Sequence, residues 1–234
     1  METIAAALRD AGRMMLALDP ALVEIVLLSL RVSLTAVLVA TLVGLPLGAA
    51  IAVRRFPGRR AVVIVLNALM GLPPVVVGLV VYLLLSRSGP LGELGLLFTP
   101  GAMIIAQAIL ITPIIAALAR QAVEDAWREY QEQLRSLGAR PAQSALTLLW
   151  DTKFSLVTTV LAGFGRAAAE VGAVMIVGGN IDGVTRVMTT AIALETSKGD
   201  LPLALGLGVV LVTIVLALNA AAYLVKETAQ RRYG

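Results

Sequence analysis

Long stretches without any charged residue alternate with short charged segments along the chain. Four stretches contain no Asp, Glu, Lys or Arg, and they cover residues 32–53, 61–86, 94–119 and 201–225. A fifth, 154–181, contains only two charges, Arg166 and Glu170. A helix needs about 20 residues to cross the roughly 30 Å of hydrocarbon in a bilayer, so this pattern predicts five transmembrane helices. The first can begin as early as Ala21, which would place Arg31 inside the helix.

The composition favours a membrane protein over a water-soluble one. Hydrophobic residues make up 59% of the 234 residues, charged residues 15%, and the mean hydropathy is +0.90. A soluble domain has about 45–50% apolar and about 25% charged residues. With so few charges to cover it, a soluble globule would expose large apolar patches. We therefore expect an all-α polytopic membrane protein.

Lysine and arginine are distributed unequally between alternate loops. One set of loops, with the C-terminal segment, carries twelve: Arg54, Arg55, Arg59, Arg60, Arg120, Arg128, Arg135, Arg140, Lys153, Lys226, Arg231 and Arg232. The other set carries five: Arg9, Arg13, Arg87, Arg186 and Lys198. Because cytoplasmic loops carry the excess of positive charge, the amino terminus is predicted outside and the carboxyl terminus inside. This clustering also fits membrane topology better than a nucleic-acid-binding face.

The predicted organisation has three parts. Residues 1–20 form an external or interfacial segment, 21–226 a transmembrane domain with a loop at 120–153, and 227–234 a cytoplasmic tail. The first segment does not resemble a signal peptide, because acidic residues interrupt it and it has no apolar core. An amphipathic segment on the membrane surface and a disordered tail are both compatible with it.

Several residues inside the spans are candidates for a translocation path or gate. Pro73 and Pro74 interrupt the second stretch near its middle, and broken helices at that depth recur in transporters. Backbone N–H groups freed there, and hydroxyls such as that of Thr112, could bind an anion. Arg31 could take part in the path or extend to the headgroups.

The two charges of the fifth stretch, Arg166 and Glu170, lie four residues apart. On a continuous helix they would share one face and could pair. Two interpretations stay open. The pair could lie near the path and act as an anion attractor or gate, or it could fix the helix register or bridge two subunits.

The loop at 120–153 is much longer than a turn requires. Apolar residues recur on one helical face at spacings of four, three, four and three: Val123, Trp127, Tyr130, Leu134 and Leu137. Gly138 suits the end of this helix and Pro141 the first turn of the next one. The pattern predicts a protruding helix-turn-helix whose apolar stripe has too few neighbours in its own chain to bury it. A helix lying on the bilayer surface is the alternative.

The same loop carries a recognisable motif. Residues 132–141, Glu-Gln-Leu-Arg-Ser-Leu-Gly-Ala-Arg-Pro, resemble the "EAA" signature of ABC importer permeases: Glu132 and Gly138 take its fixed positions, and Leu148 takes its Ile position. Gln133 and Leu134 depart from its small pair. The block at 44–48 resembles such permeases in general, and the block at 71–79 resembles their oxyanion branch. The blocks at 163–174, 178–181 and 189–200 most resemble tungstate importer permeases.

This resemblance implies a function and a set of partners. Two copies of the permease would form the pore in the plasma (inner) membrane, two ABC ATPase subunits would dock on the loop, and an external solute-binding protein would deliver the oxyanion. The residues implied in ATPase coupling are Glu132, Leu134, Arg135, Leu137, Gly138, Ala139 and Pro141. Tungstate is the expected substrate, with molybdate or sulfate as the alternative. A secondary carrier or a membrane scaffold is a more distant alternative.

The chain has no energy source or catalytic site of its own. It contains neither cysteine nor histidine, so Cys/His metal sites and the common nucleophile–imidazole arrangements are excluded. A phosphate-binding loop needs glycine before its lysine, and the three lysines follow Thr152, Ser197 and Val225. We expect no enzyme activity and no cofactor or metal bound by this chain, with ATP and Mg²⁺ on the partner ATPase.

Overall fold

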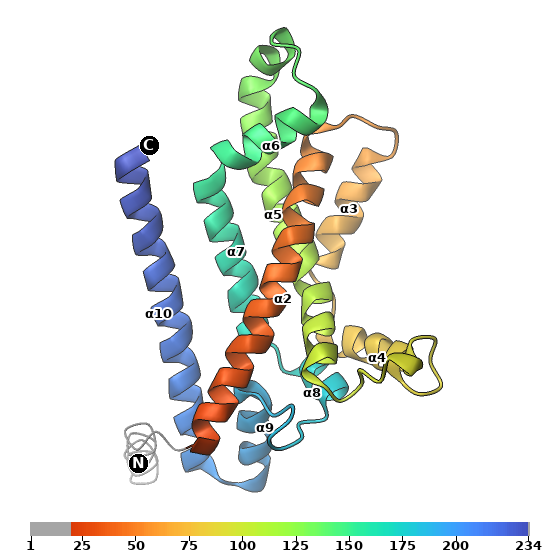
Figure 1. Ribbon diagram of the computed structural model, residues 1–234, viewed down its shortest axis with the longest axis vertical. Coiled ribbons are helices and arrows are strands. Elements are labelled where there is room, and N and C mark those ends of the chain that lie inside the picture. Colours follow the sequence, from red (N-terminus) through yellow and green to blue (C-terminus); the bar gives the residue numbers. More distant parts are fainter. Residues whose placement is uncertain (1–19, 234) are drawn as a thin grey trace. The chain divides into compact units, whose positions relative to one another are not determined.

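The computed structural model describes residues 20–233, and in this part of the chain it contains helices and no strands (Figure 1). The all-α prediction is therefore confirmed. The elements are α2 (Pro20–Val53), α3 (Arg59–Leu69), α4 (Pro74–Leu85), the short 3₁₀ helix η1 (Gly92–Leu94), α5 (Pro100–Ser136), α6 (Pro141–Asp151), α7 (Lys153–Ala168), α8 (Gly172–Gly178), α9 (Met188–Lys198) and α10 (Leu201–Tyr233). The prediction for the segment 1–20 lies outside the described residues, apart from Pro20.

Three of these helices are long and apolar enough to cross a membrane by themselves: α2, α5 and α10. The number rises to five if each of two bent helix pairs, α3 with α4 and α6 with α7, counts as one span. α2 begins at Pro20 and contains Arg31, as the early start predicted. α5 begins at Pro100 and not at residue 94, because the chain turns at Gly95 and Phe98, which both have positive φ angles.

The described chain folds into two compact units. The first combines residues 20–35, 73–107 and 167–219, and the second combines 36–72, 108–166 and 220–233. Each unit is therefore assembled from segments that are distant in the sequence.

In the first unit, the start of α2 packs with α9 and the start of α10. Their core consists of Met188, Ala191 and Leu207, with apolar residues of α2 and α10 packed around it. Ser29 adds a polar contact, since its Oγ accepts a hydrogen bond from the backbone N–H of Met188 at 2.7 Å. A serine inside an apolar helix thus fixes the first residue of α9.

The same unit contains the helix that follows the predicted break. α3 ends at Leu69, and α4 starts again with Pro74 in its first turn, which confirms the break at the two prolines. α4 packs directly on α8, and the two lie together in Figure 1. At their crossing a Cβ on Gly78 would lie 2.8 Å from Cα of Ala173. Only glycine allows this approach.

In the second unit, the end of α2 packs against α3 and the middle of α5. Ile51, Leu66, Ala116 and Ala117 form a buried cluster there. Alanines at the crossing bring the helix backbones close, as is usual for helices packed in a membrane. The far end of α5, α6, most of α7 and the end of α10 complete this unit. The far end of α5 and α6 carry the candidate site.

Replacing Gly78 with alanine tests the α4–α8 contact. We expect Gly78→Ala to lower the free energy of unfolding by about 1–3 kcal/mol, because the added methyl group must push the backbone of Ala173 away. Gly165→Ala in α7 is the matched control, since a Cβ there meets nothing within 4 Å; it should be neutral or slightly stabilising. Unfolding of the purified protein in detergent, followed by circular dichroism, measures both. Equal effects of the two substitutions would contradict the close crossing.

Candidate functional site

The second unit contains the helix-turn-helix that the sequence predicts. We call "the hairpin" the part of α5 from Val123 onward, the turn at 137–140, and α6. The turn is built as expected: Gly138 has φ 71°, and the N–H of Ala139 donates to the carbonyl of Leu134 at 3.0 Å. Pro141 opens α6, and the side chain of Gln143 accepts a hydrogen bond from the N–H of Arg140.

The inner side of the hairpin is packed, which corrects one prediction. Val123 of α5 and Leu148 of α6 are fully buried with the end of α2. The residues packed around this cluster are Ala126, Trp127, Tyr130, Leu134, Ala145 and Leu149. The expectation that the apolar stripe lacks neighbours in its own chain is therefore wrong for most of it, because α6 folds back and covers it. Only Leu137, which is 81% exposed, stays uncovered by the described residues.

A network of charges joins the base of the hairpin to neighbouring helices. The carboxylate of Glu124 pairs with Arg120 and Arg128 on its own helix, and with Arg59 at the start of α3 at 3.1 Å. Arg59 also donates from Nε to the carbonyl of Ile51 in α2 at 2.8 Å. One partly buried carboxylate therefore links three helices, which fixes the direction in which the hairpin projects.

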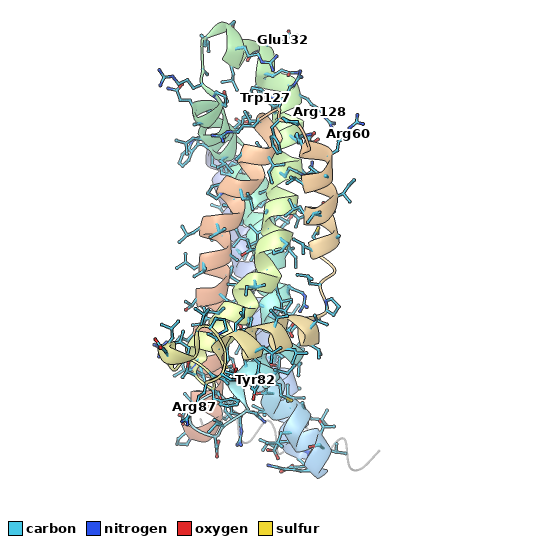
Figure 2. All side chains as sticks on the ribbon, turned by 90° about the vertical axis from the view of Figure 1, so that its right-hand side faces the viewer. Arg60, Tyr82, Arg87, Trp127, Arg128 and Glu132 are labelled. Atoms are coloured by element: carbon cyan, nitrogen blue, oxygen red, sulfur yellow. The ribbon has the colours of Figure 1, made fainter. Side chains whose placement is uncertain are left out.

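The outer side of the hairpin is exposed and charged. Figure 2 shows Glu132 nearer to the tip than Trp127 and Arg128. Arg135 lies over the ring of Trp127, with its guanidinium carbon 5.6 Å from the ring centroid. The carboxylates of Glu129 and Asp151 raise the pKa of Tyr130, which lies beyond the apolar part of α5.

All the residues expected to couple to an ATPase come together at this end of the hairpin. Glu132, Arg135, Leu137 and Gly138 are exposed, whereas Leu134 is partly buried against the inner cluster. Ala139 and Pro141 form the turn and the start of α6. Leu134 therefore supports the hairpin, and Leu137 is the apolar side chain available to a partner.

A basic groove that the sequence pattern did not predict lies beside the hairpin. It has a volume of about 770 Å³, and four arginines line it together with Phe56 and Trp127: Arg54, Arg55, Arg135 and Arg140. No carboxylate is among its described lining residues. Arg54 and Arg55 entered the prediction only as topology signals. The periodic pattern of the loop could not reveal that the end of α2 lies next to it.

The first unit holds the most buried carboxylate that the sequence singled out. Glu170 is 3% exposed, and its Oε1 accepts a hydrogen bond from the N–H of Ala173 at 3.0 Å. Its carbonyl accepts another from the hydroxyl of Thr189 at 2.8 Å. A carboxylate that accepts from an N–H group in the first turn of α8 satisfies that donor and complements the positive end of the helix. Glu170 thus fixes the start of α8.

We expected Arg166 and Glu170 to lie on one continuous helix, but the structure places a break between them. α7 ends at Ala168, and Glu170 lies in the break before α8. The stretch 154–181 is therefore two helices and not one. The reason is tertiary: the backbone and side chain of Glu170 are committed to Thr189 and to the start of α8. Arg166 lies in the last turn of α7.

The remaining path candidates supply fewer anion donors than expected. The N–H groups of Val76 and Val77 both donate to the carbonyl of Pro73, and Pro74 has no N–H group to offer. The hydroxyl of Thr112 donates to the carbonyl of Ala108 in its own helix at 2.7 Å. Arg31 is exposed and lines a cavity of about 620 Å³ in the first unit.

Two buried polar groups of the first unit were not predicted. Gln107 donates from Nε2 to the carbonyl of Ala167 at 3.2 Å, and its Oε1 has no partner among the described residues. Thr185 is fully buried, donates to the carbonyl of Gly178 and accepts from the N–H of Ile181. A lone Gln or Thr carries no sequence pattern that would predict such buried hydrogen bonds.

Comparisons with known proteins agree with this architecture. The family model described as "Binding-protein-dependent transport system inner membrane component" matches residues 44–234. A protein named "Tungstate uptake system permease protein TupB" from Peptoclostridium acidaminophilum is 44% identical over 227 residues, covering 97% of this chain and 100% of that protein. A protein of the same name from Campylobacter jejuni is 40% identical, covering 74% of this chain and 72% of that protein.

A third relative carries a broader name. "Probable anion ABC transporter permease protein" from Haloferax volcanii is 43% identical over 204 residues, covering 85% of this chain and 88% of that protein. Permeases named for sulfate and molybdenum transport are similar at about 30% identity or less.

Removing the charge of Glu124 tests the network at the base of the hairpin. We expect Glu124→Gln to lower the free energy of unfolding by about 1–3 kcal/mol, because three guanidinium groups lose a shared, partly buried counter-charge. Asp125→Asn is the matched control, since Asp125 is exposed and reaches only Arg128, at 3.7 Å; its effect should stay within about 0.5 kcal/mol. Thermal unfolding in detergent distinguishes them. The network has no structural role if Glu124→Gln behaves like the control.

Proposed function

Because the chain belongs to the family of inner membrane components of binding-protein-dependent transport systems, we propose that it is the permease subunit of an ATP-driven importer that carries tungstate into the cell. The observation that carries this proposal is the 44% identity to a tungstate uptake permease over the full length of that protein. The weaker similarity of sulfate and molybdenum permeases supports the wider class of tetrahedral oxyanions.

Family membership confirms several predictions directly. The chain is a permease subunit of an ABC importer and not an enzyme, and it resides in the inner membrane as a multi-pass protein. Such a permease works with a separate ATPase subunit and a solute-binding protein. These conclusions do not depend on which oxyanion is carried.

Five spans and a defined orientation complete the proposal. The spans are α2, the bent pair α3 and α4, α5, α7 and α10, while α6, which forms the second bent pair with α7, belongs to the hairpin. α7 is 16 residues long and so reaches about 24 Å, most of the roughly 30 Å of hydrocarbon. The excess of lysine and arginine in the loops that contain the hairpin supports a cytoplasmic hairpin, with the amino terminus and α9 outside.

In the proposed assembly, two copies of this chain form the pore and two ATPase subunits dock on the two hairpins. ATP and Mg²⁺ belong to the ATPases, and this chain binds neither. The hairpin suits the role of a lever, because its packed inner side and the Glu124 network support a rigid projection. Leu137 and the exposed charges around it are its docking surface. Movement of the hairpins then changes the access of the pore from one side of the membrane to the other.

The path residues are proposed with distinct roles. Glu170 positions α8 and does not contact the anion, because a carboxylate in the path would repel it. Arg31 and Arg166 are the cationic candidates for attracting the dianion, while Pro73 and Pro74 shape the break before α4. Thr112 offers its oxygen only as an acceptor, so it is the weakest of these candidates for binding an oxyanion.

Uptake measurements test the substrate. Deleting the gene for this chain should remove most tungstate accumulation from medium in which tungstate is scarce, measured as cellular tungsten by mass spectrometry. In the wild type, excess molybdate should compete weakly and excess sulfate should hardly compete, because a specific oxyanion site distinguishes ions by size and hydrogen bonding. If sulfate competed as strongly as tungstate itself, the substrate would be sulfate and not tungstate.

A charge on the docking surface should abolish ATPase binding without unfolding the permease. We expect Leu137→Glu to weaken copurification of the ATPase by about thirtyfold, as for loss of a central apolar contact in an interface. Gly138→Pro should act similarly through the turn. Its φ of 71° is incompatible with proline, and its N–H donates to the carbonyl of Arg135.

Thr228→Glu provides the matched control. It adds the same charge at an exposed position near the end of α10, outside the hairpin. This variant should retain the ATPase, and all three proteins should insert into the membrane in similar amounts. A full complex recovered with Leu137→Glu would refute docking at the hairpin tip.

A further inference from the structure

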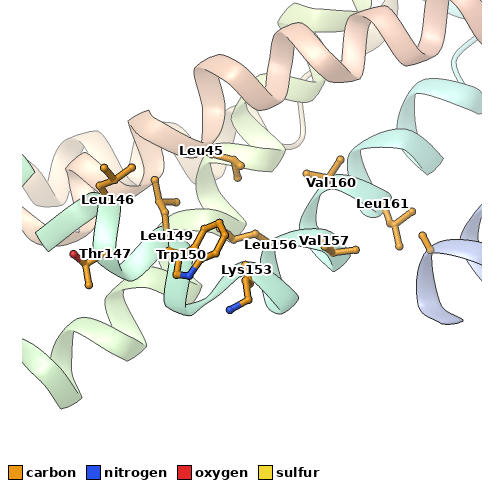
Figure 3. Close-up of a pocket in the computed structure, with 11 residues that line it drawn as sticks. Leu45, Leu146, Thr147, Leu149, Trp150, Lys153, Leu156, Val157, Val160 and Leu161 are labelled. Carbon is orange, nitrogen blue, oxygen red and sulfur yellow. The ribbon is translucent and has the colours of Figure 1, made fainter. Parts of the chain in front are cut away.

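An apolar groove lies at the bend between α6 and α7, in the second unit (Figure 3). The two helices meet at 79°, and the groove has a volume of about 930 Å³. We call it "the elbow groove". Its described lining is Leu45, Leu146, Thr147, Leu149, Trp150, Lys153, Leu156, Val157, Val160, Leu161 and Ala222.

α6 has two apolar sides, and the side that lines the groove is not covered by the described chain. One side, with Leu148, is buried in the inner cluster of the hairpin. The other side carries Leu146 and Trp150, which are 71% and 74% exposed. Apolar side chains this exposed are costly in water, but in an inner membrane protein they can contact hydrocarbon. The indole ring of Trp150 is also suited to the boundary between hydrocarbon and headgroups.

Lys153 lines the groove, and Lys226 is bonded to a chain neighbour of its lining. The Nζ of Lys153 is 5.1 Å from the ring centroid of Trp150 and 5.0 Å from that of Phe154, and Figure 3 shows it pointing away from the helices. The Nζ of Lys226 donates to the hydroxyl of Thr158, the neighbour of Val157 in the groove lining, at 2.9 Å. Two ammonium groups therefore lie beside an otherwise apolar lining.

Asp151 and Glu227 are the acidic residues nearest in sequence to the two lysines, and neither lines the groove. Asp151, at the end of α6, is exposed. Glu227 pairs with Arg231 at 2.6 Å. No carboxylate belongs to the described lining of the groove. The two ammonium groups are thus left to attract an anion from outside the described chain.

We propose that the elbow groove binds an anionic phospholipid, with an acyl chain along its leucines and valines and the phosphate at Lys153 and Lys226. An apolar lining with cations at one side matches an amphiphile with a negative head. Basic residues at the membrane surface favour anionic lipids by roughly fivefold each. A lipid bound here would support the joint between the hairpin and α7. This site depends on the membrane location of the chain and not on tungstate or on ATPase docking.

The chain supplies its own probe for this site. It has two tryptophans, Trp127 and Trp150, so Trp127→Phe leaves Trp150 as the single emitter. This variant would be reconstituted in phosphatidylcholine vesicles in which an equal minor fraction is either brominated phosphatidylglycerol or brominated phosphatidylcholine. Bromine quenches indole fluorescence on contact. We expect stronger quenching by the brominated phosphatidylglycerol.

Substitutions at the two lysines then locate the headgroup. Lys153→Gln with Lys226→Gln should remove most of the preference for phosphatidylglycerol, a loss of roughly twenty-fivefold at most if the two effects add. Lys198→Gln, on α9 and paired with Glu195, is the matched control and should retain the preference. Equal quenching by both lipids, quenching by neither, or a preference that survives loss of both lysines would each overturn the proposal.

A second measurement covers the case in which Trp127→Phe weakens the hairpin. Native mass spectrometry of the otherwise unaltered protein, released from vesicles of equal phosphatidylglycerol and phosphatidylcholine, should show retained phosphatidylglycerol. The double lysine variant should lose it. Retention of either lipid in equal amounts by both proteins would contradict the site.

Discussion

The contact between α5 and α6 is the interaction on which the account of this chain depends. Val123 and Leu148 are fully buried in it, and burying a side chain of this kind stabilises a fold by about 1.5–3 kcal/mol. Without this contact the end of α5 would be a single exposed helix with an apolar face. With it, the hairpin supports itself, and the Glu124 network fixes its direction relative to α2 and α3. In the proposed importer, this rigid projection transmits the movement of the docked ATPase to the spans.

In the first unit, broken helices must stay ordered in an apolar environment. Each break leaves backbone groups without helical partners, and these are costly in hydrocarbon. The side chain of Glu170 satisfies an N–H group at the start of α8, and Thr189 satisfies the carbonyl of Glu170. Gly78 then lets α4 pack closely on α8. The charged and small residues of these stretches are explained first by this local order.

Signals in the sequence were sufficient where one residue type determines the backbone. Pro73 and Pro74 predicted the break before α4, and Gly138 with Pro141 predicted the turn and the start of α6. Amphipathic spacing predicted which face of α5 is apolar, but it could not say what covers that face. α6 covers it, so Leu134 supports the hairpin while Leu137 remains exposed. The end of α7 at Ala168 was missed because it depends on Thr189, nineteen residues from Glu170 in the sequence.

The central claim is that the hairpin faces the cytoplasm, and the absence of cysteine allows a direct test. Ser136→Cys in the hairpin and Ser197→Cys in α9 form a matched pair, because both serines are exposed and both donate to a carbonyl three residues earlier. A membrane-impermeant maleimide is added to intact cells whose outer layer has been made permeable to it. It should label the cysteine at position 197 before lysis, and the cysteine at position 136 only after lysis. Labelling of position 136 in intact cells would contradict the account.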